Sequence, residues 1–140
     1  MLWNKATRFE YRIEIIRFDP QLVEQVLTFT NAGAAAAAIS EVSDETVVIA
    51  VTQRRNNFCV GDFSVWRSAG RTLVRLGEHR NHDGRQLFDS DTPTGEVAFR
   101  DDDGSNFYVP FAETVDVDVA NSAMLHWIVT GDATGALLWS

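Results

Sequence analysis

Polar and apolar residues alternate at the start of the chain. Over residues 8–15, arginine and glutamate occupy every second position. The positions between them are apolar or aromatic: Phe9, Tyr11, Ile13 and Ile15. A period of two places the two sets on opposite faces of an extended chain. The pattern predicts a half-exposed β-strand over residues 8–18.

Two segments of different character follow. Asp19 and Pro20 have the form of a helix cap and a first helical residue, and the predicted helix stops at residues 31–33. Its apolar side would consist of Leu22, Val23, Val26, Leu27 and Phe29. The run from Ala34 to Ala38 fits a helix by propensity, but the glycine before it and the apolar residues after it fit a strand. We expect a strand or extended segment there.

Short segments rich in valine, isoleucine and aromatic residues follow from residue 46, separated by polar or glycine-containing turns. The turns are short enough to join antiparallel neighbours. Strands are predicted at residues 46–52, 58–67, 71–78, 86–88, 96–100 and 106–109, with a polar loop at residues 79–85. Residues 101–105 contain an Asp-Gly step and are predicted to form an acidic hairpin tip.

The last part of the chain predicts an amphipathic helix, a glycine stop and a short closing strand that ends in Trp139. Asp116 or Asp118 can cap the helix with a carboxylate. Gly131 can adopt the left-handed conformation that ends it. The stripe that faces the sheet has spacings of three and four. It consists of Val119, Ala120, Ala123, Met124, Leu125, Trp127, Ile128 and Thr130.

The order of these elements predicts an α+β fold. A run of strands between one early and one late helix favours a single antiparallel β-sheet, a meander, with one N-terminal and one C-terminal helix packed against one face. A chain of 140 residues is long enough to bury a core without disulfides or metals. One domain over residues 1–140 is expected.

The C-terminal pattern also resembles a known family. An acidic cap, a helix with alanines and an aromatic residue, a threonine-glycine step and a final tryptophan are similar to the ending of the type 1 immunity-protein family of bacterial polymorphic-toxin systems. The matching positions are Val115, Ala120, Ala123, Trp127, Thr130, Gly131 and Trp139. The chain departs from the family pattern at Asp116, Ala133 and Thr134, where prolines are common. The resemblance implies a protein that neutralises a cognate toxin, often a nuclease or a deaminase, by occluding its active site.

The formal net charge is −8, and it is concentrated in one part of the chain. Residues 81–118 contain ten acidic residues and two arginines, whereas the remainder is neutral overall. This concentration argues against direct nucleic-acid binding, which uses a clustered basic face. It suits a basic protein partner, although acidic loops also serve solubility alone.

Together, the resemblance and the charge predict a toxin-binding surface, because the substrate clefts of such toxins are basic. We expect acidic residues of the loops to mimic a phosphate chain there, with an aromatic residue as an anchor. The expected residues are Asp89, Asp91, Asp101, Asp102 and Asp103, with Phe107 or Tyr108 as the anchor.

An alternative hypothesis is a small-molecule-binding or catalytic α+β domain. Its pocket would lie on the open face of the sheet and be lined by Phe63, Trp66 and Tyr108. The same aromatic residues are more simply core residues. A deep pocket with convergent polar groups would favour this alternative, and a flat or convex acidic surface would favour the binding protein.

Residues with catalytic or metal-binding chemistry form no recognised pattern. His79, His82 and Asp83 lie in a polar loop without a further ligand pair. Residues 101–104 lack the carboxylate spacing of a calcium loop. Cys59 falls in an apolar strand pattern and is expected to be buried and inert. We therefore expect no enzymatic activity, no metal and no cofactor.

The single cysteine cannot form an internal disulfide, and residues 1–14 have neither the apolar region nor the cleavage site of a signal peptide. No apolar run approaches the roughly 20 residues that span a bilayer. These features predict a cytoplasmic protein without a membrane partner. A monomer is expected.

Overall fold

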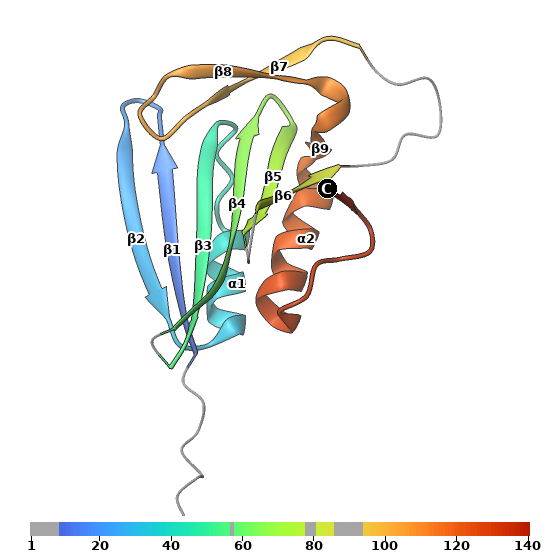
Figure 1. Ribbon diagram of the computed structural model, residues 1–140. Coiled ribbons are helices and arrows are strands. Elements are labelled where there is room, and N and C mark those ends of the chain that lie inside the picture. Colours follow the sequence, from blue (N-terminus) through green and yellow to red (C-terminus); the bar gives the residue numbers. More distant parts are fainter. Residues whose placement is uncertain (1–8, 57, 78–80, 86–93) are drawn as a thin grey trace, which may run out of the picture.

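The computed structural model describes residues 9–56, 58–77, 81–85 and 94–140 (Figure 1). In these residues it contains ten β-strands, two α-helices and one turn of 3-10 helix. The strands are β1 (Phe9–Arg17), β2 (Val23–Phe29), β3 (Val47–Arg55), β4 (Phe58–Ser68), β5 (Arg71–Gly77), β6 (Asn81–Arg85), β7 (Glu96–Arg100), β8 (Asn106–Pro110), β9 (Val115–Asp116) and β10 (Leu138–Trp139). The helices are α1 (Ala32–Ser40) and α2 (Val117–Thr130), and the 3-10 turn is η2 (Phe111–Glu113).

Eight of these strands form one antiparallel sheet in the order β10-β6-β5-β4-β3-β1-β2, with β9 beside β5. The helices cover one face of this sheet, and the separate β7–β8 hairpin crosses the other (Figure 1). The α+β class is confirmed. The expectation of a single sheet is wrong, because Val97, Phe99 and Val109 of the hairpin are buried in one cluster with Leu73 of the main sheet. Burial of this apolar side stacks the hairpin on the sheet instead of at its edge.

The predicted N-terminal helix after Asp19 is wrong. The segment forms a turn and then β2, which pairs with β1 along its whole length. The apolar positions fit both periods, but Val23, Val26 and Thr28 are β-branched and favour a strand. Pairing with β1 also packs Leu27 and Phe29 against the main core. Tertiary pairing decides what the local pattern leaves open.

The alanine run is helical rather than extended. Ala34 to Ala38 lie inside α1, and the side chain of Asn31 caps its start by accepting a hydrogen bond from the Ala34 amide at 3.0 Å. Alanine has the best helix propensity. Ala35 and Ile39 bury one side of the helix in the core. Cap, propensity and burial together outweigh the extended alternative.

Helix α2 agrees with the sequence in its bounds and its end. Gly131 closes it in the left-handed conformation, with φ of 79°. Thr130, predicted on the buried stripe, is exposed, and its hydroxyl donates a hydrogen bond to the His126 carbonyl. Asp116 occupies the cap position without a side-chain cap, because its carboxylate pairs with Arg71 of β5. The buried side of the helix consists of Ala120, Ala123, Met124, Trp127 and Ile128.

The main core lies between the sheet and the helices. Trp127 of α2 is 1% exposed, and its ring centroid lies 5.8 Å from that of Phe63 in β4. A second, smaller core lies under the β7–β8 hairpin, with Trp66 and Phe107 packed against it. The sheet therefore carries a separate apolar cluster on each face.

The chain ends against the sheet. Residues 81–85, predicted as part of a polar loop, form β6 between β5 and β10. Gly84 permits this contact, because a Cβ atom there would lie only 3.1 Å from the ring of Trp139. That ring is in turn edge-on to Phe63, at a centroid distance of 6.1 Å. The predicted closing strand is confirmed, whereas the strand predicted at residues 86–88 lies outside the described residues.

Candidate functional site

The strand register brings loops that are distant in the sequence to one end of the main sheet. Arg17 at the end of β1 lies opposite Val47 at the start of β3, and Val47 lies opposite Arg67 near the end of β4. The loops at these positions therefore lie side by side, together with the start of α2 beside β5 (Figure 1). The tip of the β7–β8 hairpin reaches the same end, where the Arg100 guanidinium lies 5.6 Å from the ring centroid of Phe18.

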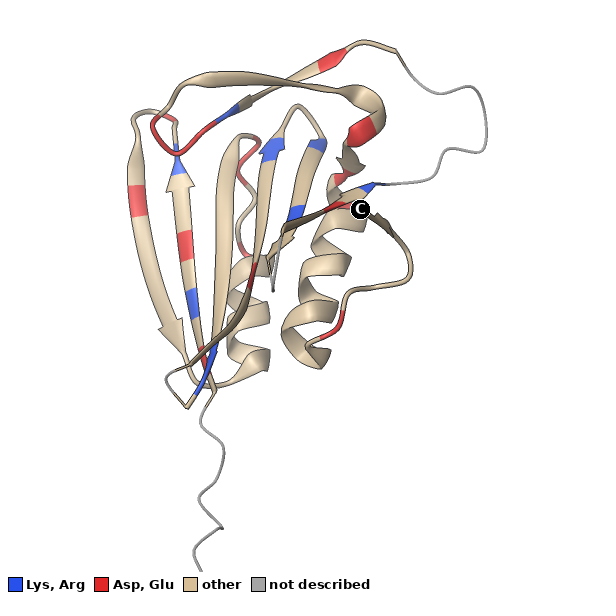
Figure 2. Ribbon diagram, viewed as in Figure 1, with Lys and Arg blue, Asp and Glu red and all other residues tan. Residues whose placement is uncertain are grey.

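This end of the molecule is rich in carboxylates, as Figure 2 shows, and is named the acidic end below. Four separate segments of the chain contribute to it. Its members are Asp19, Asp44, Glu45, Asp101, Asp102, Asp103 and Asp116.

The arginines at the acidic end are engaged within the protein. Arg17 lies 3.4 Å from Asp44, and Arg71 is paired with Asp116. Arg100 donates a hydrogen bond of 2.8 Å to a backbone carbonyl of the hairpin tip. These contacts leave the arginine charges in place, but the carboxylates of the acidic end outnumber its arginines, so the net electrostatic field at this end is negative.

The hairpin tip is a closed turn. The Asp101 amide donates to the Ser105 carbonyl, and the Gly104 amide donates back to the Asp101 carbonyl, both at 2.8 Å. Ser105 donates from its hydroxyl and its amide to Asp103, which lowers the pKa of Asp103. A hydrogen bond shared with Asp101, and the adjacent charges of Asp101 and Asp103, raise the pKa of Asp102. The turn thus holds three carboxyl groups close together against their repulsion.

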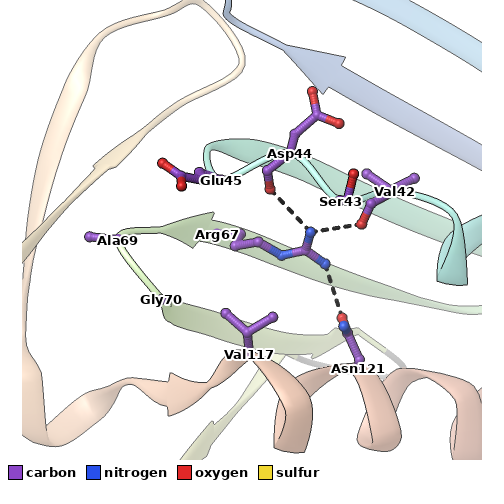
Figure 3. A pocket seen from close by; sticks show the side chains of 9 residues that line it. All are labelled: Val42, Ser43, Asp44, Glu45, Arg67, Ala69, Gly70, Val117 and Asn121. Atoms are coloured by element: carbon purple, nitrogen blue, oxygen red, sulfur yellow. Dashed lines mark hydrogen bonds between the residues drawn. The ribbon is translucent and has the colours of Figure 1, made fainter.

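A cavity of about 400 Å³ opens at the acidic end, between the loop that follows α1, the β4–β5 turn and α2 (Figure 3). Arg67 lines it and is 5% exposed. Its guanidinium donates to the carbonyls of Val42 at 2.9 Å and Asp44 at 3.2 Å, and to the side chain of Asn121 at 3.1 Å. Burial lowers the pKa of Arg67, and the Asp44 carboxylate opposes this effect. The guanidinium ties the loop after α1 to α2.

The residues predicted for toxin binding fall in different settings. The three aspartates at residues 101–103 lie together at the hairpin tip. Tyr108 of β8 is 64% exposed, whereas Phe107 is stacked on a ring of β7 with 5.8 Å between centroids. Asp89 and Asp91 lie outside the described residues. Of the two proposed anchors, Tyr108 is the exposed one.

Sequence reasoning missed the carboxylates that other segments bring to the same end. Asp19, Asp44 and Glu45 lie in two loops without any motif that connects them to the hairpin tip. Their neighbourhood arises from the pairing of β1 with β3 and from the hairpin crossing the sheet. No local signal in the sequence identifies such an arrangement.

The aromatic residues of the alternative hypothesis do not line one pocket. Phe63 is buried in the core on the helix side of the sheet. Trp66, three residues later on β4, lies on the opposite face beneath the hairpin, because strand side chains alternate between faces. Tyr108 is exposed on the hairpin itself.

Cys59 is exposed, which corrects the prediction that it is buried. Its neighbours on β4, Phe58 and Val60, are 77% and 48% exposed. A register shift between Gln53 and Arg54 of β3 sets this end of the β3–β4 hairpin off from the rest of the sheet. An apolar strand pattern does not bury a residue where no helix or second sheet lies over it.

In the part of the chain that the structure describes, no group of three or more histidine, cysteine, aspartate or glutamate residues is placed to hold a metal ion. Asp83 instead pairs with Arg75 at 3.0 Å, beside His82 in β6. His79 lies outside this part. Over the same residues, no helix is long and apolar enough to cross a membrane.

Asp62 of β4 lies on the face of the sheet opposite the helices and is partly buried. Burial raises the pKa of Asp62, and the charge of Arg75 partly offsets the effect. The charged form of Asp62 is therefore less favourable in the folded protein than in the unfolded chain. The protonated form contributes to the free energy of unfolding at low pH, and this contribution is lost as the pH rises through the folded pKa. Asp62→Asn is expected to be slightly more stable than the wild type at pH 7. The difference should disappear below an unfolded pKa of about 4.

Urea unfolding between about pH 7 and pH 3 measures this difference. Asp132→Asn removes an exposed carboxylate elsewhere and serves as the control. Equal stability of wild type and Asp62→Asn at neutral pH would show that burial does not penalise this charge.

No protein-family model matches the chain, and no curated protein matches it. Among solved structures, the chain is similar to a hypothetical protein from Neisseria gonorrhoeae, with a TM-score of 0.51 and 9% sequence identity. The similarity covers 96% of this chain and 95% of that one. At this identity the likeness shows the fold alone.

Proposed function

We propose that the protein is an immunity protein that binds a cognate bacterial toxin domain and blocks its active site. The observation that carries the proposal is the acidic end, where four segments gather carboxylates that outnumber the arginines beside them. A surface with one sign of charge suits a partner of the opposite sign, because complementary fields accelerate encounter and select the partner.

The class of partner follows from the charge and from the C-terminal resemblance. A toxin that acts on nucleic acid needs a basic cleft for its substrate. Carboxylates that enter such a cleft occupy the positions of phosphates and exclude the substrate. The protein then acts by binding, without catalysis and without a cofactor.

The hairpin tip contributes geometry as well as charge. Its turn is closed by backbone and side-chain hydrogen bonds, so the three carboxylates are held in place before a partner arrives. Preorganised groups lose less conformational freedom on binding. A hydrogen bond shared with Asp101 is the main cause of the raised pKa of Asp102. The charges of Asp101 and Asp103 add a smaller effect, which a cationic partner would relieve. Tyr108 on the same hairpin presents an aromatic surface of the kind enriched at interfaces.

The test is co-expression with a toxin domain, taken from the neighbouring reading frame or captured from the native strain with tagged protein. The toxin domain alone is expected to arrest growth of a bacterial host. Co-expression of this protein is expected to restore growth, and the purified pair should form a complex without toxin activity. A toxin domain that is active, unbound and not inhibited would contradict the proposal.

Charge reversal at the hairpin tip tests the contact surface. The triple variant Asp101→Lys, Asp102→Lys, Asp103→Lys is expected to lower the association rate constant with the toxin at least about tenfold at low salt. Added salt should slow the wild type more than the variant, because screening removes the same field. Association kinetics at two salt concentrations measure both effects.

The matched control changes the net charge equally outside the acidic end. It carries Glu10→Lys, Glu14→Lys and Asp132→Lys, and a much smaller change in association rate is expected. Equal slowing in both variants would assign the effect to net charge, and unchanged kinetics in the tip variant would remove the tip from the interface.

A further inference from the structure

Strand β2 is one edge of the eight-stranded sheet. It pairs with β1 on one side, and none of the described strands pairs with its outer side. The opposite edge of the sheet is the two-residue strand β10. Of the two edges, β2 therefore presents the long one.

Edge strands of monomeric proteins are usually protected by lysine, proline, a bulge or a short length. Strand β2 has little of this protection: its seven residues, VEQVLTF, include no lysine and no proline, pair with β1 without a register shift, and carry one charge, on Glu24. Val23 and Val26 are each 46% exposed. The outer edge of β2 is thus a template for another strand.

The sequence of β2 is complementary to itself about Val26. In an antiparallel pair of two β2 strands centred there, Val26 faces Val26 of the second copy, and Val23 faces Phe29. Each Glu24 faces Thr28, so the two carboxylates are separated rather than opposed. Arg12 of β1 lies beside Thr28 in the same sheet, which places a cation two strands from the other copy's Glu24.

Helix α1 contacts β2, and its composition indicates that a partner covers the surface in this region. None of its nine residues is charged, although Ala34 and Ala37 are exposed. Helices that face water usually carry charged residues on their outer side. A twofold axis through the Val26 pair, perpendicular to the sheet, keeps the helices of both copies on the same side of the joined sheet.

We propose that the protein forms a symmetric homodimer in which two β2 strands pair antiparallel about Val26 and join the two eight-stranded sheets into one. The proposal rests on the edge strand and on α1, and does not depend on the function proposed above. It replaces the expectation of a monomer.

Sedimentation equilibrium over a concentration series tests the dimer. The wild-type chain is expected to be dimeric, and Val26→Lys is expected to be monomeric at the same concentrations, because two ammonium groups would face each other at the centre. Val129→Lys places the same charge on an exposed valine of α2 and is expected to stay dimeric. Circular dichroism verifies that both variants fold. A monomeric wild type, or a dimer unaffected by Val26→Lys, would overturn the proposal.

Engineered cysteines test the register in a Cys59→Ser background. Val26→Cys is expected to form an intermolecular disulfide under mild oxidation, because directly opposed residues have Cα separations that a disulfide can bridge. Glu24→Cys is expected to stay reduced, because the two positions would lie about 13 Å apart along the strands. Cross-linking at both positions, or at neither, would overturn the register. A third outcome is a monomeric wild type that binds the toxin, together with a Val26→Lys variant that does not. The edge of β2 would then pair with a strand of the toxin, and the dimer would be excluded.

Discussion

Replacing Trp127 with alanine is expected to lower the free energy of unfolding by about 3–5 kcal/mol. Trp127 is the largest of the fully buried side chains and lies between α2 and the sheet, against Phe63. Truncation removes its apolar contacts and leaves a cavity that the strands can close only in part. Because domains of this kind are stable by about 5–15 kcal/mol, the loss is a large fraction of the total.

Urea unfolding followed by circular dichroism measures the effect of Trp127→Ala. Val129→Ala is the matched control, because Val129 lies on the same helix but is 65% exposed. We expect the control to stay within about 0.5 kcal/mol of the wild type. A Trp127→Ala variant as stable as the control would show that α2 does not pack on β4 as described.

Replacing Arg67 with methionine is expected to cost about 3 kcal/mol of unfolding free energy. Methionine retains much of the side-chain volume but removes the guanidinium. The carbonyls of Val42 and Asp44, in the loop after α1, and the side chain of Asn121 would then lose a charged donor. The net loss is smaller than the sum of three such bonds, because removal of the buried cation also removes its desolvation penalty.

The control for this variant is Arg12→Met. The Arg12 side chain is 44% exposed and lies 3.5 Å from Glu14, so its replacement is expected to change stability by less than about 1 kcal/mol. Hydrogen exchange adds a local readout, because Arg67→Met should release the loop between α1 and β3. A loss no larger than that of Arg12→Met would mean that water replaces the guanidinium at little cost.

Segments with a strong, unambiguous period could be predicted from the sequence. The alternation over β1 buries Tyr11, Ile13 and Ile15, and the stripe on α2 buries Ala123 and Trp127. Residues 22–29 are compatible with both a helix and a strand, and pairing with β1 determines their structure. In the alanine run, helix propensity favoured a helix. Asn31 could be identified as the cap that begins this helix only if the segment before it was assigned as a strand.

The candidate site was predictable only where its residues are consecutive. The Asp-Gly step identifies the hairpin tip, and residues 101–103 supply adjacent carboxylates there. Asp19 and Asp44 join the same end through the register of strands far apart in the chain. The exposure of Cys59 likewise depends on whether another element covers that end of β4. The residue pattern of β4 gives no information about this.

The β7–β8 hairpin rests on an apolar cluster of its own, across the sheet from the core that the helices cover. Amino-acid replacements at its tip are therefore expected to leave the packing of α1 and α2 unchanged. If the protein binds toxins as proposed, stability and partner choice can diverge independently: related proteins can change the outer surface of the hairpin and keep the same framework. For protein engineering, the same separation makes this hairpin the segment to randomise in a library that must stay folded.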